Sequence, residues 1–292
     1  MVTPDELLRV LLAPLLISTI IAVIGYWRRW AWALPLAMGA GFIVGYVLMG
    51  APKLPPQDGT DWLFWLAMPL TLVGVLSTLL PERWRWPVAI VAGAVAFGVV
   101  RPLVPGGVSA GAATLFSVGA AVVGFLLALV ATLVEERLTP LAVILAFSFT
   151  LGSAAVLVMS SNLRIVGVYG IAAAAATGSA AIFAGPLSKS GPRYRTLVSP
   201  GVAIVATGLL AGLFTGGRFY PDPGVTWANL LVVSLAPLLL LAAAWLPIKS
   251  VAVRAVIGLV LVSIALAVVT APTALAAKHA AEGSDDPYGS NG

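Results

Sequence analysis

The sequence predicts an all-α integral membrane protein in which about ten transmembrane helices form one bundle. Three observations predict this class. First, 60% of the 292 residues are hydrophobic and only 9% are charged, whereas soluble domains carry about 25% charged residues. Second, apolar runs long enough to cross about 30 Å of hydrocarbon recur along the chain. Third, the segments between these runs combine Pro or Gly with polar or charged residues, as turns do.

The apolar runs are predicted to be helices, because backbone polar groups in lipid must be satisfied within the segment. The alternating segments of about ten residues that build a membrane β-barrel do not occur. Pro69 and Pro237 each remove a helix hydrogen bond near the centre of a span. Such breaks are compatible with passive kinks and with the discontinuous helices of transporters. The ten spans are predicted at 7–26, 31–50, 61–80, 85–104, 108–134, 138–160, 165–186, 197–217, 225–247 and 251–277.

Two short segments, "GYWRRWAW" at 25–32 and "PERWRWP" at 81–87, alternate tryptophan with arginine. The tryptophan ring is apolar while its N–H needs a partner, so tryptophan prefers the headgroup region of a bilayer. Both segments are therefore predicted to be turns at the cytoplasmic membrane surface; the alternative is a lipid-headgroup site. The predicted interfacial anchors are Trp27, Arg28, Arg29, Trp30, Trp84 and Trp86.

Orientation follows from the distribution of Lys and Arg. Ten of the sixteen lie in the loops after odd-numbered spans, and six lie on the other side. The positive-inside rule then predicts that both termini are outside the cytoplasm and that the loop at 188–195 is inside. The predicted location is the inner (plasma) membrane, as a multi-pass protein.

Composition also argues against several kinds of chemistry. The chain has no cysteine, and its one histidine is His279, so thiolate sites and two-histidine metal or haem sites are excluded within it. No carboxylate lies in the middle of a predicted span, where charges are costly and usually functional. The net charge of +5 is thinly spread. We therefore expect no enzymatic activity, no cofactor or metal, and no nucleic-acid partner.

Hydroxyl groups gather near the middle of two predicted spans. "FSFTLGS" carries Ser148, Thr150 and Ser153, and "ATGSA" carries Thr177 and Ser179. These five residues are the candidate substrate path. The alternative role is hydrogen bonding between helices or to a carbonyl of the same helix. Residues two positions apart on a helix point about 200° apart, so Ser148 and Thr150 cannot both face one narrow cavity in a regular helix.

Glycines recur at four-residue spacing in two predicted spans, which lets helix backbones approach closely. The expected role is packing within the bundle, and the alternative is homodimerisation. We also expect Gly212→Leu to disrupt packing far more than Leu213→Ala, on the interpretation that Leu213 faces lipid. The packing candidates are Gly41, Gly45, Gly208, Gly212 and Gly216.

Ten spans in about 290 residues resemble the drug/metabolite transporter superfamily in size and span count. In that family two five-helix halves are related by inversion, which would correspond here to 1–137 and 138–277. The resemblance covers topology only: no family motif occurs, and the central proline of the third span, Pro69, has no counterpart in the eighth. Beyond the 1–277 bundle, residues 278–292 are polar and are expected to be a disordered tail.

Two functional hypotheses follow. The first is a transporter of a small or lipid-like solute, which should have a cavity at mid-depth lined by groups such as Ser148 and Thr150. The second is a non-catalytic scaffold or anchor subunit of a larger membrane complex, which should be solidly packed and present a face of small residues. The expected partners are the lipid bilayer and either a second copy of the chain or another subunit.

Overall fold

The computed structural model describes residues 4–50, 53, 56, 59–80, 84–135, 137–161, 163–189, 198–220 and 225–284. All regular secondary structure within these ranges is helical. The elements are α1 (Pro4–Arg28), α2 (Ala33–Met49), α3 (Gly59–Ser77), α4 (Arg85–Leu103), α5 (Ala110–Glu135), α6 (Pro140–Ser160), α7 (Arg164–Lys189), α8 (Val198–Phe219), α9 (Trp227–Leu235), η3 (Ala236–Leu238), α10 (Leu239–Ala244) and α11 (Val251–Ser284).

The predicted spans agree with these elements, and Pro69 and Pro102 change the helices little. Pro69 lies within the continuous helix α3, and Pro102 lies in the last turn of α4. Pro237 instead divides the ninth span, because it lacks the N–H that would continue the helix. The span is α9, the 3₁₀ turn η3 and α10 in succession.

The fold is that of a polytopic membrane protein. Eight of the spans in the described residues are long and apolar enough to cross a bilayer, counting α9 to α10 as one. The other two, α2 and the stretch Asp61–Ser77 of α3, are apolar but shorter. At 17 residues, α2 has a length of about 25 Å, slightly less than the average hydrocarbon thickness.

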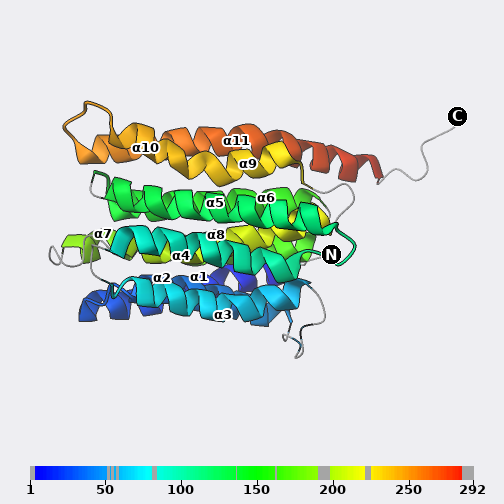
Figure 1. Cartoon of the computed structure of the whole chain (residues 1–292), viewed down its shortest axis with the longest axis horizontal. Coiled ribbons are helices and arrows are strands. Elements are labelled where there is room, and N and C mark those ends of the chain that lie inside the picture. Colours follow the sequence, from blue (N-terminus) through cyan, green and yellow to red (C-terminus); the bar gives the residue numbers. More distant parts are fainter. Residues whose placement is uncertain are drawn as a thin grey trace, which may run out of the picture.

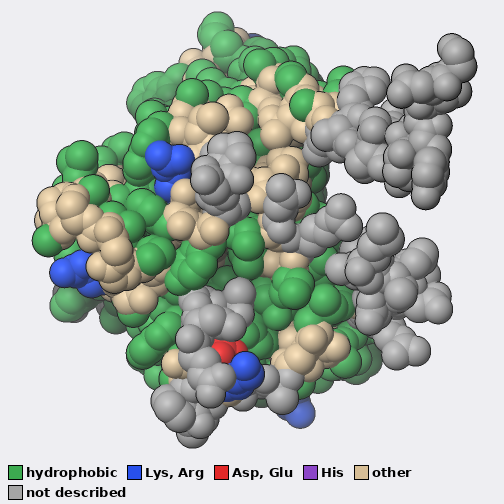
Figure 2. Space-filling model, turned by 90° about the vertical axis from the view of Figure 1, so that its right-hand side faces the viewer, with side chains coloured by type: hydrophobic (Ala, Val, Ile, Leu, Met, Phe, Trp, Pro, Cys, Tyr) green, Lys and Arg blue, Asp and Glu red, His purple; other side chains and the backbone are tan. Residues whose placement is uncertain are grey.

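The helices lie side by side with their axes roughly parallel, and both termini emerge at the same end of the bundle (Figure 1). The connections after α1, α3, α5, α7 and α10 lie at the opposite end. The loops after the odd-numbered spans, which hold ten of the sixteen basic residues, therefore belong to one end of the bundle. Of the loop predicted at 188–195, residues 190–195 lie outside the described residues. Among the described residues, the end that carries the termini shows scattered charged side chains between hydrophobic ones (Figure 2).

Tryptophans are found at both ends of the bundle. Trp27 and Trp30 are exposed at the α1–α2 turn, and Trp84 and Trp86 are exposed where α4 begins. The guanidinium of Arg28 lies 6.0 Å from the ring centre of Trp30. Arg29, also exposed, has a φ of 58°. The opposite end carries Trp62, Trp65 and Trp227 on α3 and α9.

Arg29 occupies a left-handed position that usually carries glycine. Its N–H donates to the carbonyl of Tyr26 at 3.2 Å, and the Trp30 N–H donates to that of Gly25 at 2.8 Å. These two bonds form a Schellman turn, which satisfies the last carbonyls of α1. The Arg-Trp segment therefore closes one helix and reverses the chain into the next.

Helix α8 occupies the centre of the bundle and packs on α2 through α7. The predicted packing glycines lie at contacts within the chain. A Cβ added at Gly208 would meet Leu70 of α3, one at Gly212 would meet Leu63 of α3, and one at Gly216 would meet Val166 of α7. Small residues thus allow the central helix to approach its neighbours closely.

The other predicted packing glycines, Gly41 and Gly45, lie on α2. A Cβ at Gly41 would meet Ala176 of α7 at 2.7 Å and the carbonyl oxygen of Pro14 on α1 at 3.0 Å. A Cβ at Gly45 would meet Ala172 of α7 at 2.7 Å and Pro14 at 2.8 Å. This face of α2 therefore contacts α1 and α7 together.

Two details differ from the expectations. Leu213 is fully buried and does not face lipid, because α8 is surrounded by other helices. Helix α11 continues through residues 278–284, which the sequence placed in a disordered tail; the alanines of this stretch are strong helix formers. Residues 285–292 lie outside the described residues.

Candidate functional site

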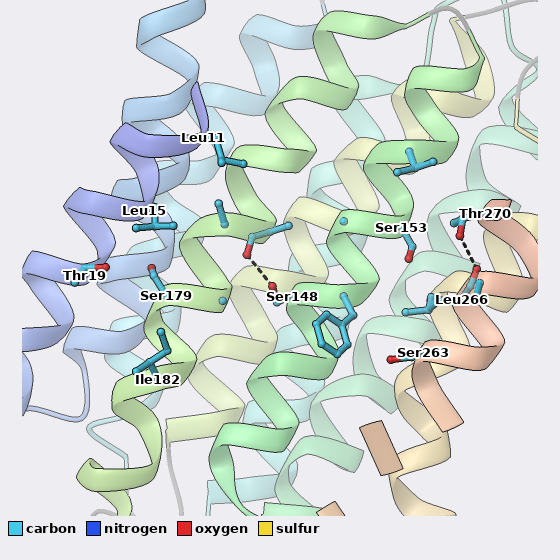
Figure 3. Close-up of a pocket in the computed structure, with 17 residues that line it drawn as sticks. Leu11, Leu15, Thr19, Ser148, Ser153, Ser179, Ile182, Ser263, Leu266 and Thr270 are labelled. Carbon is cyan, nitrogen blue, oxygen red and sulfur yellow. Dashed lines mark hydrogen bonds between the residues drawn. The ribbon is translucent and has the colours of Figure 1, made fainter. Parts of the chain in front are cut away.

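An open cavity of about 730 Å³ lies between α1 and α11, on a floor formed by α6 and α7 (Figure 3). Helix α1 packs on α7 and α11 packs on α6, so the two outer helices form the walls of a lateral groove. Leu15, Phe149 and Ile182 line it and are exposed. Because Leu15 and Phe149 lie well inside their spans, the groove opens sideways toward lipid. We call this cavity the α1/α11 groove.

Three of the five predicted path residues line this groove: Ser148 and Ser153 from α6 and Ser179 from α7. The Ser148 hydroxyl donates to the carbonyl oxygen of Ala174 across the α6–α7 interface at 2.8 Å. The Ser179 hydroxyl donates to the carbonyl oxygen of Ala176 on its own helix at 2.9 Å.

The other two predicted residues lie elsewhere. Thr150 and Thr177 are almost fully buried and do not line the groove. The Thr150 hydroxyl donates to the Ala146 carbonyl at 2.8 Å, and that of Thr177 to the Ala173 carbonyl at 2.7 Å. Because Thr150 is about 200° from Ser148 around α6, it points into the bundle while Ser148 faces the groove.

The walls add hydroxyls that the sequence analysis missed. Thr19 comes from α1, and Ser263 and Thr270 come from α11. Thr270 donates to the Leu266 carbonyl at 2.9 Å. Within the part of the chain that the structure describes, the hydroxyls of Thr19, Ser153 and Ser263 make no hydrogen bond. A single hydroxyl on an apolar span does not indicate a binding site in the sequence. These residues lie far apart in the chain, and only the packing of the helices brings them together.

Near the middle of the membrane, the groove therefore combines apolar walls with a few neutral hydroxyls. No charged side chain is found among the described residues that line it. Hydroxyls with free hydrogen-bonding capacity can bind a carbonyl, ester or hydroxyl of a ligand. The arrangement suits a neutral or weakly polar amphiphile and not an ion.

The burial of the Asp61 carboxylate, in the first turn of α3, is a second feature that the sequence analysis missed. Asp61 accepts a hydrogen bond from the Tyr46 hydroxyl at 3.2 Å and another from the Lys53 backbone N–H at 3.3 Å. Tyr46 also stacks on Tyr169, with ring centres 4.4 Å apart. These contacts tie α2, α3 and α7 together at the end of the bundle that carries the termini. Asp58, Glu136 and Asp222 lie outside the described residues, and the side chain of His279 is not described.

With this geometry established, the chain was compared with protein families, with curated proteins and with solved structures. None of the three comparisons found a match. The functional argument therefore rests on the α1/α11 groove itself.

Proposed function

We propose that the protein is a multi-pass inner-membrane transporter that admits a lipid-like solute through the α1/α11 groove. The observation that carries this proposal is the lateral, lipid-facing opening of a cavity with neutral hydroxyls at mid-depth. A solute already dissolved in the bilayer can enter sideways and keep its chain in lipid. Its weakly polar group can meanwhile exchange hydrogen bonds with Thr19, Ser153 and Ser263. No catalytic step is assigned to the protein.

The test is lipid flux in proteoliposomes that contain a fluorescent short-chain glucosylceramide, which is an uncharged amphiphile, and are bleached from outside by dithionite. Vesicles that contain the wild-type protein are expected to lose the fluorescence of their inner leaflet faster than protein-free vesicles, because the protein moves the probe to the outer leaflet. Ala267→Trp should abolish this gain, because Ala267 is exposed and lines the groove. Val268→Trp is the matched control, since Val268 is exposed on the same helix but does not line the groove.

Two results would contradict the proposal: wild-type flux no greater than that of empty vesicles, or equal flux from both tryptophan variants. The groove does not cross the bundle from end to end. This observation favours the second hypothesis, a scaffold or anchor subunit of a larger membrane complex. As a scaffold or anchor subunit, the protein would use the same groove to seat a helix of another subunit. It would then show no flux in either variant.

The proposed orientation places both termini outside the cytoplasm, because the end that carries the connections after α1, α3, α5, α7 and α10 has ten of the sixteen basic residues. The chain has no native cysteine, so single cysteines give an unambiguous readout. In intact cells, an impermeant maleimide should label Ser284→Cys and leave Ser188→Cys unlabelled until the membrane is permeabilised. The opposite labelling pattern would mean that both termini lie in the cytoplasm.

A further inference from the structure

A second cavity, of about 380 Å³, lies between α5, α8 and α9 and is separate from the α1/α11 groove. Its walls are apolar and aromatic, with Phe116 on α5, Phe214 on α8 and Trp227 on α9. The rings of Phe116 and Trp227 meet edge to face at 5.4 Å. Two hydroxyl residues complete the lining, Thr207 of α8 and Ser234 of α9. We call it the α8 cavity.

Thr207 differs from the other buried threonines that the structure describes. Each of the others donates its hydroxyl to a carbonyl three or four residues earlier, as Thr215 does to Ala211 at 2.7 Å. Thr207 is 2% exposed, and its Oγ1 has no hydrogen-bond partner. A buried hydroxyl without a partner lowers stability, because it has lost its hydrogen bonds to water. This hydroxyl therefore keeps its hydrogen-bonding capacity free for a ligand.

Ser234 adds a second hydroxyl. It is buried to a similar degree and makes no hydrogen bond within the described residues. On the α5 side, Gly119 leaves room, because an added Cβ would meet nothing within 4 Å. The methyl group of Thr207 lies toward Gly124 of α5.

The depth of Thr207 decides which acceptor can reach it. Arg218 lies in the last turn of α8, where its guanidinium is 5.0 Å from the ring centre of Trp227 and marks the membrane edge. Thr207 lies eleven residues earlier on this helix, and therefore about 16 Å deeper. The ester carbonyls of a phospholipid stay beside the headgroup and do not reach that depth. A neutral lipid without a charged headgroup can place a carbonyl there.

We propose that the α8 cavity binds a neutral, carbonyl-bearing lipid of the quinone type. A ring carbonyl accepts hydrogen bonds from Thr207 and Ser234, the ring lies among the aromatic walls, and the apolar chain extends past Gly119 toward lipid. No charged side chain is found among the described residues that line the cavity, which fits a neutral ligand. This proposal is independent of the α1/α11 groove.

The test measures the affinity of purified protein in nanodiscs for decylubiquinone. Thr207→Val keeps the side-chain shape and removes the donor, so the Kd should rise about tenfold. Gly119→Leu fills the cavity and should abolish binding. Thr215→Val and Gly111→Leu are the matched controls on the same two helices, and both should bind like the wild type. Gly111 is exposed, has open space around it and does not line the cavity.

Thermal unfolding without ligand gives a second readout. Thr207→Val should raise the midpoint by about 2–4 °C, because it removes an unsatisfied buried hydroxyl, whereas Thr215→Val should give no gain. The proposal is overturned if Thr207→Val destabilises the protein, or if it binds decylubiquinone as tightly as the wild type does. It is also overturned if a phospholipid competes for the cavity as well as the quinone does.

Discussion

Gly41→Leu is expected to lower the free energy of unfolding by about 3 kcal/mol or more, at the upper end for overpacking a close contact. The position lies where α2 meets α1 and α7. An added Cβ would meet Ala176 at 2.7 Å and the Pro14 carbonyl oxygen at 3.0 Å, and it would also meet the hydroxyl of Ser18. Ala176 has no flexible end that could move aside, and Pro14 contributes backbone. The helices must therefore separate.

Ser18 adds to this cost, because its hydroxyl donates to the Ala37 carbonyl at 2.6 Å and links α1 to α2. Moving Ser18 would break this hydrogen bond between the two helices in a buried site. Unfolding in mild detergent measures the change, and Gly98→Leu is the control, since a Cβ there would meet nothing within 4 Å. If both variants are equally stable, the glycine face of α2 is not a close helix contact.

The helices themselves could be predicted from the sequence, because a membrane span must satisfy its backbone internally and must be long and apolar. These requirements act on local sequence, so "ERLTP" between α5 and α6 was sufficient to separate two spans. Thr139 of this segment caps α6 by accepting a hydrogen bond from the Ala142 N–H at 3.3 Å. The Pro237 break is local in the same way, since it follows from one missing N–H.

The candidate site could be predicted only in part. Serines in the middle of a span are visible in the sequence, but their direction around the helix is not. Ser148 faces the α1/α11 groove while Thr150 faces the core. In lipid, both faces of a span are apolar, so hydrophobic periodicity does not separate the buried face from the exposed one. Thr19 and Ser263 belong to walls more than one hundred residues from Ser148, and only the helix arrangement brings them to it.

The same absence of periodicity explains why Leu213 was expected to face lipid. Helix α8 is no more apolar than its neighbours, yet it is the central helix and most of its surface is buried. The sequence feature that distinguishes this central helix is its content of small residues and not its hydrophobicity. Glycine and alanine on several faces of one span indicate neighbours on several sides.

Leu213→Ala is accordingly expected to destabilise the protein by about 3 kcal/mol, within the range for truncating a buried leucine. Leu213 is 0% exposed and belongs to the main hydrophobic core. Its side chain lies beside Gly170 of α7, where an added Cβ would be 3.1 Å from Cδ1. Removing it leaves a cavity between α8 and α7 that no lipid chain can fill, so the dispersion contacts of the surrounding atoms are lost.

The matched control is Leu72→Ala on α3, because Leu72 is 58% exposed and its contacts are replaced by lipid or detergent. Chemical unfolding in detergent should therefore separate two variants that remove the same atoms. A loss for Leu213→Ala no greater than that for Leu72→Ala would mean that α8 is at the periphery.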